Sequence, residues 1–207
     1  MFTDQQLELI ASELRTSGFC ILRDALPQGL SNALSDLANS RSDYRLAGTG
    51  RKGEHSLDTT VRSDQIVWIE GDDGAEREWA EMMAALQLYL NRALYLGLFS
   101  FESHFAHYAP GAHYEKHRDA FKGQSNRILS CVTYLNDEWH RAWGGELVIY
   151  SDEDRELIRV LPERGTVVLF LSEEFPHEVL PASAHRHSIA GWFRVNGSEH
   201  GGADPSR

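Results

Sequence analysis

The stretch TVVLFLSEEFPHEVLPASAHRHSIAGWFRV, residues 166–195, decides the fold class of this chain. Residues 166–171 and 188–195 are rich in β-branched and aromatic side chains, which favours two short β-strands. The same texture extends upstream to residue 101, where further strands are expected at 103–108, 128–135, 146–150 and 156–160. Many short strands without a helical interruption are typical of a sandwich or jelly roll.

The first 100 residues differ, because their apolar residues recur at helical spacing. Thr3 and Gln6 form a capping-box pattern at the start of one predicted helix. Pro27 opens a second predicted helix, and a third is expected over about 75–95. Between the first two helices, residues 19–22 are predicted to form a strand.

These patterns predict a fold that is mostly β with supporting N-terminal helices, a double-stranded β-helix (a cupin-like jelly roll). We expect a single domain over residues 1–207. Its expected parts are helical support over 1–100 with a loop at 41–62, a jelly-roll core over 101–195 and a tail over 196–207.

The composition narrows the class of protein. With 42% hydrophobic and 25% charged residues, it is typical of a folded protein. The net charge of -11 argues against general affinity for nucleic acid or an anionic membrane. Cys20 and Cys131 are too few for a disulfide framework, which favours a reducing compartment. No signal-peptide pattern or long apolar run is visible, so we expect a cytoplasmic protein. We also expect a monomer.

Residues 41–62 lie between the second and third predicted helices and are more basic than the rest of this acidic chain. The ordinary interpretation of such a segment is a solvated loop. Long loops in compact domains are usually functional or disordered, so the alternative is a loop that grips a substrate. On that alternative, Arg51 and Lys52 would be contact residues.

The β region contains a pattern that indicates a metal site. One residue separates His117 from Asp119, so on an extended backbone both side chains point to the same face. His177 supplies a second imidazole further along the chain. Two imidazoles and one carboxylate, with other positions open, form the facial triad of non-haem Fe(II) oxygenases. We therefore predict that these three residues bind iron, although most of the 10 histidines, taken singly, are ordinary surface or core residues.

Arg186 is a candidate for binding a carboxylate near that metal. It follows His177 across a short segment, so its side chain would enter the same barrel if His177 ended one strand and Arg186 began the next. A planar fork of donors suits a carboxylate better than any other side chain does. A structural salt bridge is the alternative role, but the offset from the histidine favours binding.

The motifs of this region also resemble a known family. In order they are YAPG (108–111), YEKHRD (114–119), TYLN (133–136), WGGEL (143–147) and PHEV (176–179), then Arg186 and Trp192, with RSDQIVWIEG (62–71) upstream. Together they look like the prolyl 4-hydroxylases of the Fe(II)/2-oxoglutarate-dependent dioxygenases. The resemblance covers roughly residues 60–195 and is strongest to bacterial relatives of the hypoxia-inducible-factor prolyl hydroxylases.

The resemblance implies roles for the residues around the co-substrate. Arg186 would pair with the distal carboxylate of 2-oxoglutarate, and the Tyr134 hydroxyl would donate a second hydrogen bond to it. Tyr108 would hydrogen-bond the metal-proximal end. Both tyrosines could otherwise be ordinary core aromatics, which is the commoner fate of tyrosine on a strand.

Other positions would face the substrate or only shape the fold. Trp192 would wall the pocket near the substrate, with Arg127 and Tyr114 as further contacts, although a buried core tryptophan is a close alternative. Gly144 and Gly145 are expected in a turn or bulge rather than in the chemistry.

The resemblance further implies hydroxylation of a prolyl residue at its 4-position, in an exposed loop of a protein substrate. Fe(II), 2-oxoglutarate and dioxygen would be the cofactors, ascorbate a bound reductant, and succinate and carbon dioxide the products. Elongation factor Tu is the substrate that the bacterial relatives suggest first.

Three alternatives remain open from the residues. One is an oxygenase that acts on a free amino acid, a small metabolite or a damaged nucleobase, of which the acidic charge disfavours the last. Another is a non-catalytic cupin-like metal-binding module, which has no need of Tyr134 and Arg186. A zinc hydrolase is the third, but no motif supplies its general base.

Overall fold

The computed structural model describes residues 1–48, 58–120 and 126–196. The first half of the chain contains α1 (Asp4–Ser17), β1 (Phe19–Leu22), α2 (Gln28–Ser40), β2 (Arg45–Leu46), β3 (Gln65–Trp68) and α3 (Gly74–Leu94). The second half contains β4 (Ser100–Tyr108), β5 (Tyr114–His117), β6 (Arg127–Tyr134), a 3-10 turn (Arg141–Trp143), β7 (Leu147–Tyr150), β8 (Glu156–Val160), β9 (Val167–Leu171), β10 (His177–Val179) and β11 (Arg186–Arg194). None of the helices in these ranges is long and apolar enough to cross a membrane.

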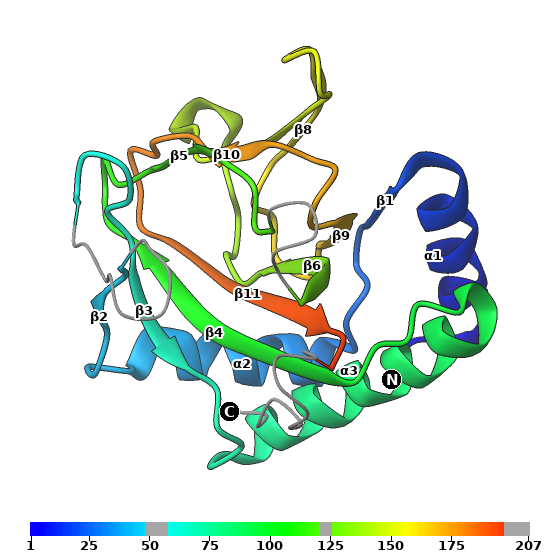
Figure 1. The fold of residues 1–207 in the computed structure, drawn as a ribbon. Helices are drawn as coiled ribbons and strands as arrows, with labels where there is room; N and C mark the ends of the chain where they lie inside the picture. Colours follow the sequence, from blue (N-terminus) through cyan, green and yellow to red (C-terminus); the bar gives the residue numbers. More distant parts are fainter. Residues whose placement is uncertain (49–57, 121–125, 197–207) are drawn as a thin grey trace.

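The strands form two antiparallel sheets (Figure 1). The major sheet has seven strands in the order β1-β9-β6-β11-β4-β3-β2, and the minor sheet has four in the order β5-β10-β7-β8. Side chains of both sheets meet in one apolar cluster, with Tyr134 and Phe170 from the major sheet and Leu147 and Ile149 from the minor sheet. The predicted double-stranded β-helix, mostly β, is therefore confirmed.

The helices cover the other face of the major sheet, where α2 and α3 run beneath β4 and β11 (Figure 1). Ile10, Leu34 and Met83 of the three helices pack in a second buried cluster with Phe105 and Ile189 of the sheet. The helices begin and end close to the predicted positions. Both hydrogen bonds of the predicted capping box between Thr3 and Gln6 are present, so the local sequence alone was enough to mark the start of α1.

Strand β11 shows how the pleat separates the two faces of the major sheet. Ile189 and Phe193 point to the helices and are fully buried in that core. Arg186, Ser188 and Trp192 alternate with them and line a cavity between the sheets. Successive side chains of a strand point to opposite faces, so one strand serves both the core and the site.

Two sequence expectations need correction. The first 100 residues are not only helical support, because β2 and β3 extend the major sheet beyond β4. β2 is the edge strand and is exposed, and its neighbour β3 is only partly buried, so neither shows a clear alternating apolar pattern. His177 does not end a strand but begins β10, which is only 3 residues long and too short to recognise from sequence.

Candidate active site

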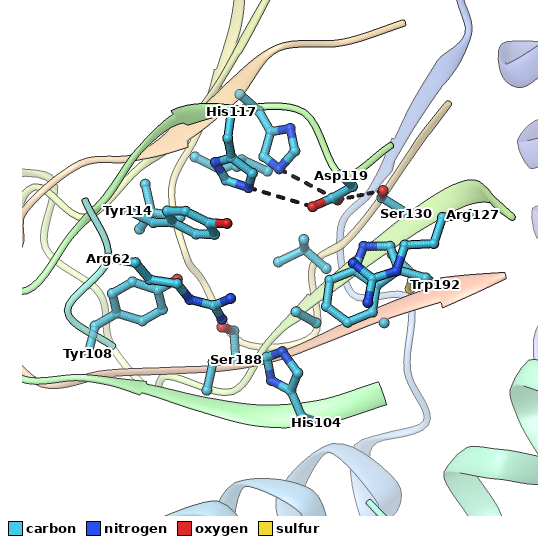
Figure 2. Close-up of a pocket in the computed structure, with 18 of the residues that line it drawn as sticks. Arg62, His104, Tyr108, Tyr114, His117, Asp119, Arg127, Ser130, Ser188 and Trp192 are labelled. Atoms are coloured by element: carbon cyan, nitrogen blue, oxygen red, sulfur yellow. Dashed lines mark hydrogen bonds and ion pairs between the residues drawn. The ribbon is translucent and has the colours of Figure 1, made fainter. Parts of the chain in front are cut away.

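Two of the predicted iron ligands lie on the minor sheet, and Asp119 lies in the bend just after β5. His117 is the last residue of β5 and His177 the first of β10, and the two histidines are directly opposite in this antiparallel pair. Asp119 points back at both rings (Figure 2): its Oδ1 is 3.5 Å from His117 Nε2, and its Oδ2 is 3.6 Å from His177 Nε2. One ligand atom from each residue lies within 4.8 Å of the other two, so the three side chains can reach a single ion.

Backbone carbonyl groups set the orientation of both imidazoles. His117 Nδ1 lies 2.7 Å from the Glu115 oxygen, and His177 Nδ1 lies 3.1 Å from the Phe175 oxygen. A carbonyl oxygen only accepts, so each Nδ1 carries the proton and donates it there. The Nε2 of each ring faces Asp119, and with the proton on Nδ1 a neutral imidazole keeps its Nε2 lone pair available to a metal.

The protonation states also suit a cation. Burial lowers the pKa of His177 from 6.5 to about 4, so this ring is neutral at neutral pH. Burial alone would raise the pKa of Asp119, but His177, His117 and the Ser130 hydroxyl outweigh it and hold that pKa well below 3.8. The site therefore offers a neutral His177 ring and an anionic carboxylate at Asp119.

Arg186 lines the same cavity and is almost fully buried, at 1% exposure. Its Nε donates to the Gly145 oxygen at 3.0 Å, and its Nη1 donates to Ser188 Oγ at 3.2 Å. Within the described ranges, no acidic side chain forms an ion pair with it. Buried charges are nearly always paired, so this cationic group calls for an anion in the cavity.

The turn predicted at Gly144 and Gly145 provides a backbone hydrogen-bond acceptor for Arg186. Gly145 has φ +76°, a conformation that favours glycine, and its carbonyl oxygen accepts the Arg186 Nε bond. A Cβ at Gly145 would lie 2.9 Å from the Ala182 Cβ and 3.4 Å from Arg186 Cδ. The absence of a side chain at this position therefore lets the backbone approach the arginine closely.

Both predicted co-substrate tyrosines flank Arg186. The guanidinium carbon lies 4.7 Å from the ring centroid of Tyr108 and 5.1 Å from that of Tyr134. Tyr108 lines the cavity, whereas Tyr134 contacts Arg186 without being one of the residues that line it. The buried hydroxyl of Tyr134 has no hydrogen-bond partner in the part of the chain that the structure describes. A buried hydroxyl without a partner costs stability, so this atom too is suited to a ligand.

Tyr114, predicted to contact substrate, lines the cavity together with Arg62, on the same side as Tyr108 (Figure 2). Its ring stacks on that of His117, with centroids 3.5 Å apart. The Arg62 guanidinium lies 4.6 Å from the Tyr114 ring centroid and is held by the buried Asp64 at 2.6 Å. The sequence did not assign Arg62 to the site, because only the fold places its guanidinium over the Tyr114 ring.

Arg127 and Trp192, the other two substrate candidates, lie against each other on the major sheet (Figure 2). The Arg127 guanidinium is 3.7 Å from the centre of the Trp192 ring and 2.9 Å from a carboxylate oxygen of Glu102. The indole Nε1 of Trp192 is buried and has no hydrogen-bond partner within the described ranges. Both side chains line the cavity that contains the triad.

The basic segment 41–62 is described only in part. Arg41 is engaged structurally, since it bonds Glu76 at 2.6 Å and ties the end of α2 to the start of α3. Arg51 and Lys52, predicted as substrate contacts, lie outside the described residues. The interpretation of this segment as a gripping loop stays a prediction.

His104 is a cavity residue that sequence reasoning set aside. It lines the cavity beneath Trp192, with ring centroids 5.5 Å apart (Figure 2). Burial first, and nearby Arg62 second, lower its pKa from 6.5 to about 4. The only available signal was its even spacing with Ala106 and Tyr108 along one strand face.

Because of this burial, His104 should make the stability of the metal-free protein depend on pH. Between pH 6.5 and about 4 the unfolded chain binds a proton that the folded protein does not. The contribution of neutral His104 to the free energy of unfolding is therefore complete above the pKa of the histidine in the unfolded chain. It is lost as the pH falls toward 4, by about 2 kcal/mol at pH 5. Urea unfolding at pH 7 and pH 5 measures it, and the His104→Gln variant should lose less stability by about that amount. Equal losses in both proteins would contradict the prediction.

Comparison with known proteins gives the class of this chain. Residues 103–194, which include the triad and Arg186, match the 2OG-Fe(II) oxygenase superfamily. A solved prolyl-4-hydroxylase from Pseudomonas putida is 38% identical with a TM-score of 0.84, and the match covers 92% of this chain and 100% of that one. The chain belongs to the 2OG-Fe(II) oxygenase superfamily, whose members require Fe(II) and 2-oxoglutarate.

Its similar relatives within that class are prolyl hydroxylases. A solved prolyl hydroxylase from Trichoplax adhaerens, in complex with a hypoxia inducible factor peptide fragment, is 26% identical with a TM-score of 0.81. That match covers 92% of this chain and 89% of the other. Egl nine homolog 1 of Mus musculus is 27% identical over 197 residues, which cover 90% of this chain and 49% of that protein. The chain thus spans about half the length of the curated relatives it matches.

Proposed function

We propose that this chain is a prolyl 4-hydroxylase, which hydroxylates a prolyl residue of a protein substrate and converts 2-oxoglutarate to succinate and carbon dioxide. Membership of the superfamily and the prolyl hydroxylases among its similar structures support the reaction type. The observation that carries the proposal is the buried Arg186, without an acidic partner in the described ranges, in one cavity with a His-Asp-His cluster. A co-substrate with a chelating end and a distal carboxylate needs this pairing of a cationic group with a metal site.

The metal role is assigned to His117, Asp119 and His177. Two imidazole nitrogens and one carboxylate oxygen are the donors of a 2-His-1-carboxylate site, which leaves further coordination positions open. The two tautomers and the ionised carboxylate described above fit a divalent cation without rearrangement. The donor set therefore fits Fe(II), the metal of this superfamily.

The co-substrate role is assigned to Arg186, Tyr134 and Tyr108. The guanidinium would pair with the distal carboxylate of 2-oxoglutarate, and the unpartnered Tyr134 hydroxyl would donate a second bond to it. Tyr108 would donate from the cavity wall toward the end nearer the metal. Together these contacts would neutralise the buried cation and satisfy the buried hydroxyl.

When bound, Fe(II), 2-oxoglutarate and dioxygen supply the oxidising chemistry. The chain positions the metal and the co-substrate and excludes water from the cavity. Arg186 would fix the direction of the co-substrate, while His117, Asp119 and His177 would hold the metal. Apolar side chains of the cavity wall, Leu147 and Val179, keep bulk water from the reacting atoms.

The proposed substrate is a proline in an exposed loop of another protein. Arg127, Trp192 and Tyr114 would contact it, because they line the cavity that also contains the triad and Arg186. The relative from Trichoplax adhaerens is a prolyl hydroxylase with a bound peptide fragment, which supports a polypeptide segment as the ligand. Elongation factor Tu is the first candidate, on the resemblance to bacterial relatives.

The test is turnover of the purified chain with Fe(II), 2-oxoglutarate and a panel of candidate proteins that includes elongation factor Tu. We expect succinate in step with a gain of about 16 Da on a proline, the mass of one oxygen atom. Amino-acid analysis should identify the product as 4-hydroxyproline. Free proline and other small metabolites form the second panel.

The outcomes separate the candidate functions. Product on free amino acids alone would replace the protein substrate with a small one. Metal and 2-oxoglutarate binding without succinate, across both panels, would contradict the proposal and favour a non-catalytic module. A hydroxylated protein other than elongation factor Tu would keep the proposal and correct only the target.

The Tyr134→Phe variant should separate co-substrate binding from folding. Its hydroxyl has no partner in the described part of the protein, so its removal should leave the melting temperature unchanged or slightly higher. A hydrogen bond to a charged group contributes about 1.5–3 kcal/mol, so the KM for 2-oxoglutarate should rise about 10- to 100-fold. Steady-state kinetics and a thermal melt measure the two effects. An unchanged KM would remove Tyr134 from the co-substrate site.

A further inference from the structure

Two buried serines hold Asp119 through Oδ2, which also lies 3.6 Å from His177 Nε2, whereas Oδ1 faces His117. Ser130, on β6, is 1% exposed, and its Oγ lies 2.6 Å from Asp119 Oδ2 (Figure 2). Ser172 follows β9 directly, is 0% exposed, and its Oγ lies 2.9 Å from that of Ser130. Strands β6 and β9 are neighbours in the major sheet, whereas the two histidines lie on the minor sheet. Asp119 is therefore tethered across the space between the sheets.

The chemistry of the carboxylate sets the direction of these bonds. An ionised carboxylate only accepts hydrogen bonds, so the Ser130 hydroxyl must donate its proton to Oδ2. The Ser130 oxygen is then left as an acceptor, and the Ser172 hydroxyl donates to it. Bonds to an ionised acceptor are short and strong, and a chain of hydroxyls strengthens them further.

We propose that Ser130 is a positioning residue that retains Oδ2 of Asp119, so that Oδ1 is the oxygen presented to the metal. Ser172 supports Ser130 in this orientation. The inference rests on the proposed role of Asp119 as a metal ligand. It assigns to this chain a second layer of residues around the site, which no spacing pattern in the sequence indicates.

The consequence concerns the number of open coordination positions. A carboxylate with two free oxygens can bind a metal through both, and would then occupy a position that the co-substrates require. With Oδ2 tied to Ser130, Asp119 binds through one oxygen. Loss of an outer-shell partner of this kind typically costs 10- to 100-fold in metal affinity.

The test is a titration of the metal-free full chain with Co(II), whose visible absorption reports coordination number without any turnover. Ser130→Ala should bind Co(II) about 10- to 100-fold more weakly and show altered band intensities. Ser130→Thr keeps a hydroxyl on the same atom and should restore affinity and spectrum. Ser172→Ala should change the Co(II) affinity and the absorption spectrum in the same direction as Ser130→Ala does, but by a smaller amount.

Ser35→Ala is the matched control. Ser35 is also a buried serine, 4% exposed, and it donates to the Leu135 carbonyl oxygen at 2.8 Å, away from the cavity. It should keep the wild-type Co(II) affinity and spectrum. If Ser35→Ala weakens binding as much as Ser130→Ala does, the loss reflects general destabilisation and the inference fails.

The remaining outcomes are also decisive. Unchanged affinity and spectrum in Ser130→Ala would overturn the positioning role while leaving the metal site intact. If Ser130→Ala does not fold, an unchanged Ser172→Ala titration overturns it instead. A wild-type chain that does not bind Co(II), or an Asp119→Ala variant that binds it equally well, would refute the metal assignment itself, which is a different failure.

Discussion

Replacing His117 with alanine should abolish the formation of succinate from 2-oxoglutarate. His117 supplies one of the two imidazole nitrogens within 4.8 Å of the other ligand atoms, and a pair of ligands holds a divalent cation far more weakly than three do. The loss should exceed the roughly 100-fold that removal of an outer-shell partner costs. Succinate release and the iron content of the purified protein should fall together.

The fold should survive this change. The His117 side chain is 17% exposed, and its ring packs on Tyr114 without entering either hydrophobic cluster. Circular dichroism and a thermal melt of the metal-free protein should therefore match the wild type. His140→Ala is the control, because His140 is exposed and contacts Trp143, away from the cavity. A His117→Ala protein with a normal rate of succinate formation would refute the assignment of the triad.

Replacing Arg186 with methionine should raise the KM for 2-oxoglutarate by about 100-fold or more. Each hydrogen bond to a charged partner contributes about 1.5–3 kcal/mol, and a guanidinium fork donates two to one carboxylate. The interaction is made to the ground state and the transition state alike, so kcat at saturating 2-oxoglutarate should change much less than KM. Initial rates over a wide range of co-substrate concentration measure both constants.

Methionine nearly matches the arginine in length and leaves no buried charge. Without co-substrate the wild-type protein holds a cation without an acidic partner in the described ranges, so Arg186→Met should be at least as stable as the wild type. Arg159→Met, at an exposed arginine paired with Glu156, is the control and should leave KM unchanged. An unchanged KM in Arg186→Met would place 2-oxoglutarate elsewhere. A large loss of stability would show that the arginine is mainly structural.

Residue patterns within short stretches of sequence predicted the helices and most of the strands. The helix start at Thr3 follows from a capping box, and α3 from apolar residues at helical spacing. Strands β1, β4, β6, β7, β8, β9 and β11 were expected within a few residues of their bounds, because each carries a local run of β-branched, aromatic or other apolar residues. Strands β3, β5 and β10 are 3 or 4 residues long and depend on pairing with neighbours distant in the sequence, so no local pattern marks them.

The sequence by itself determined the donor chemistry: two imidazoles, a carboxylate and an arginine, at spacings that an extended backbone can bring to one face. Only the tertiary structure decided what surrounds them. The Ser130 hydroxyl on Asp119, His104 beneath Trp192 and Arg62 over Tyr114 all join residues from different strands or segments. Such contacts depend on how the two sheets pair and stack, and register between distant strands is set by packing of the whole core rather than by local residue preference.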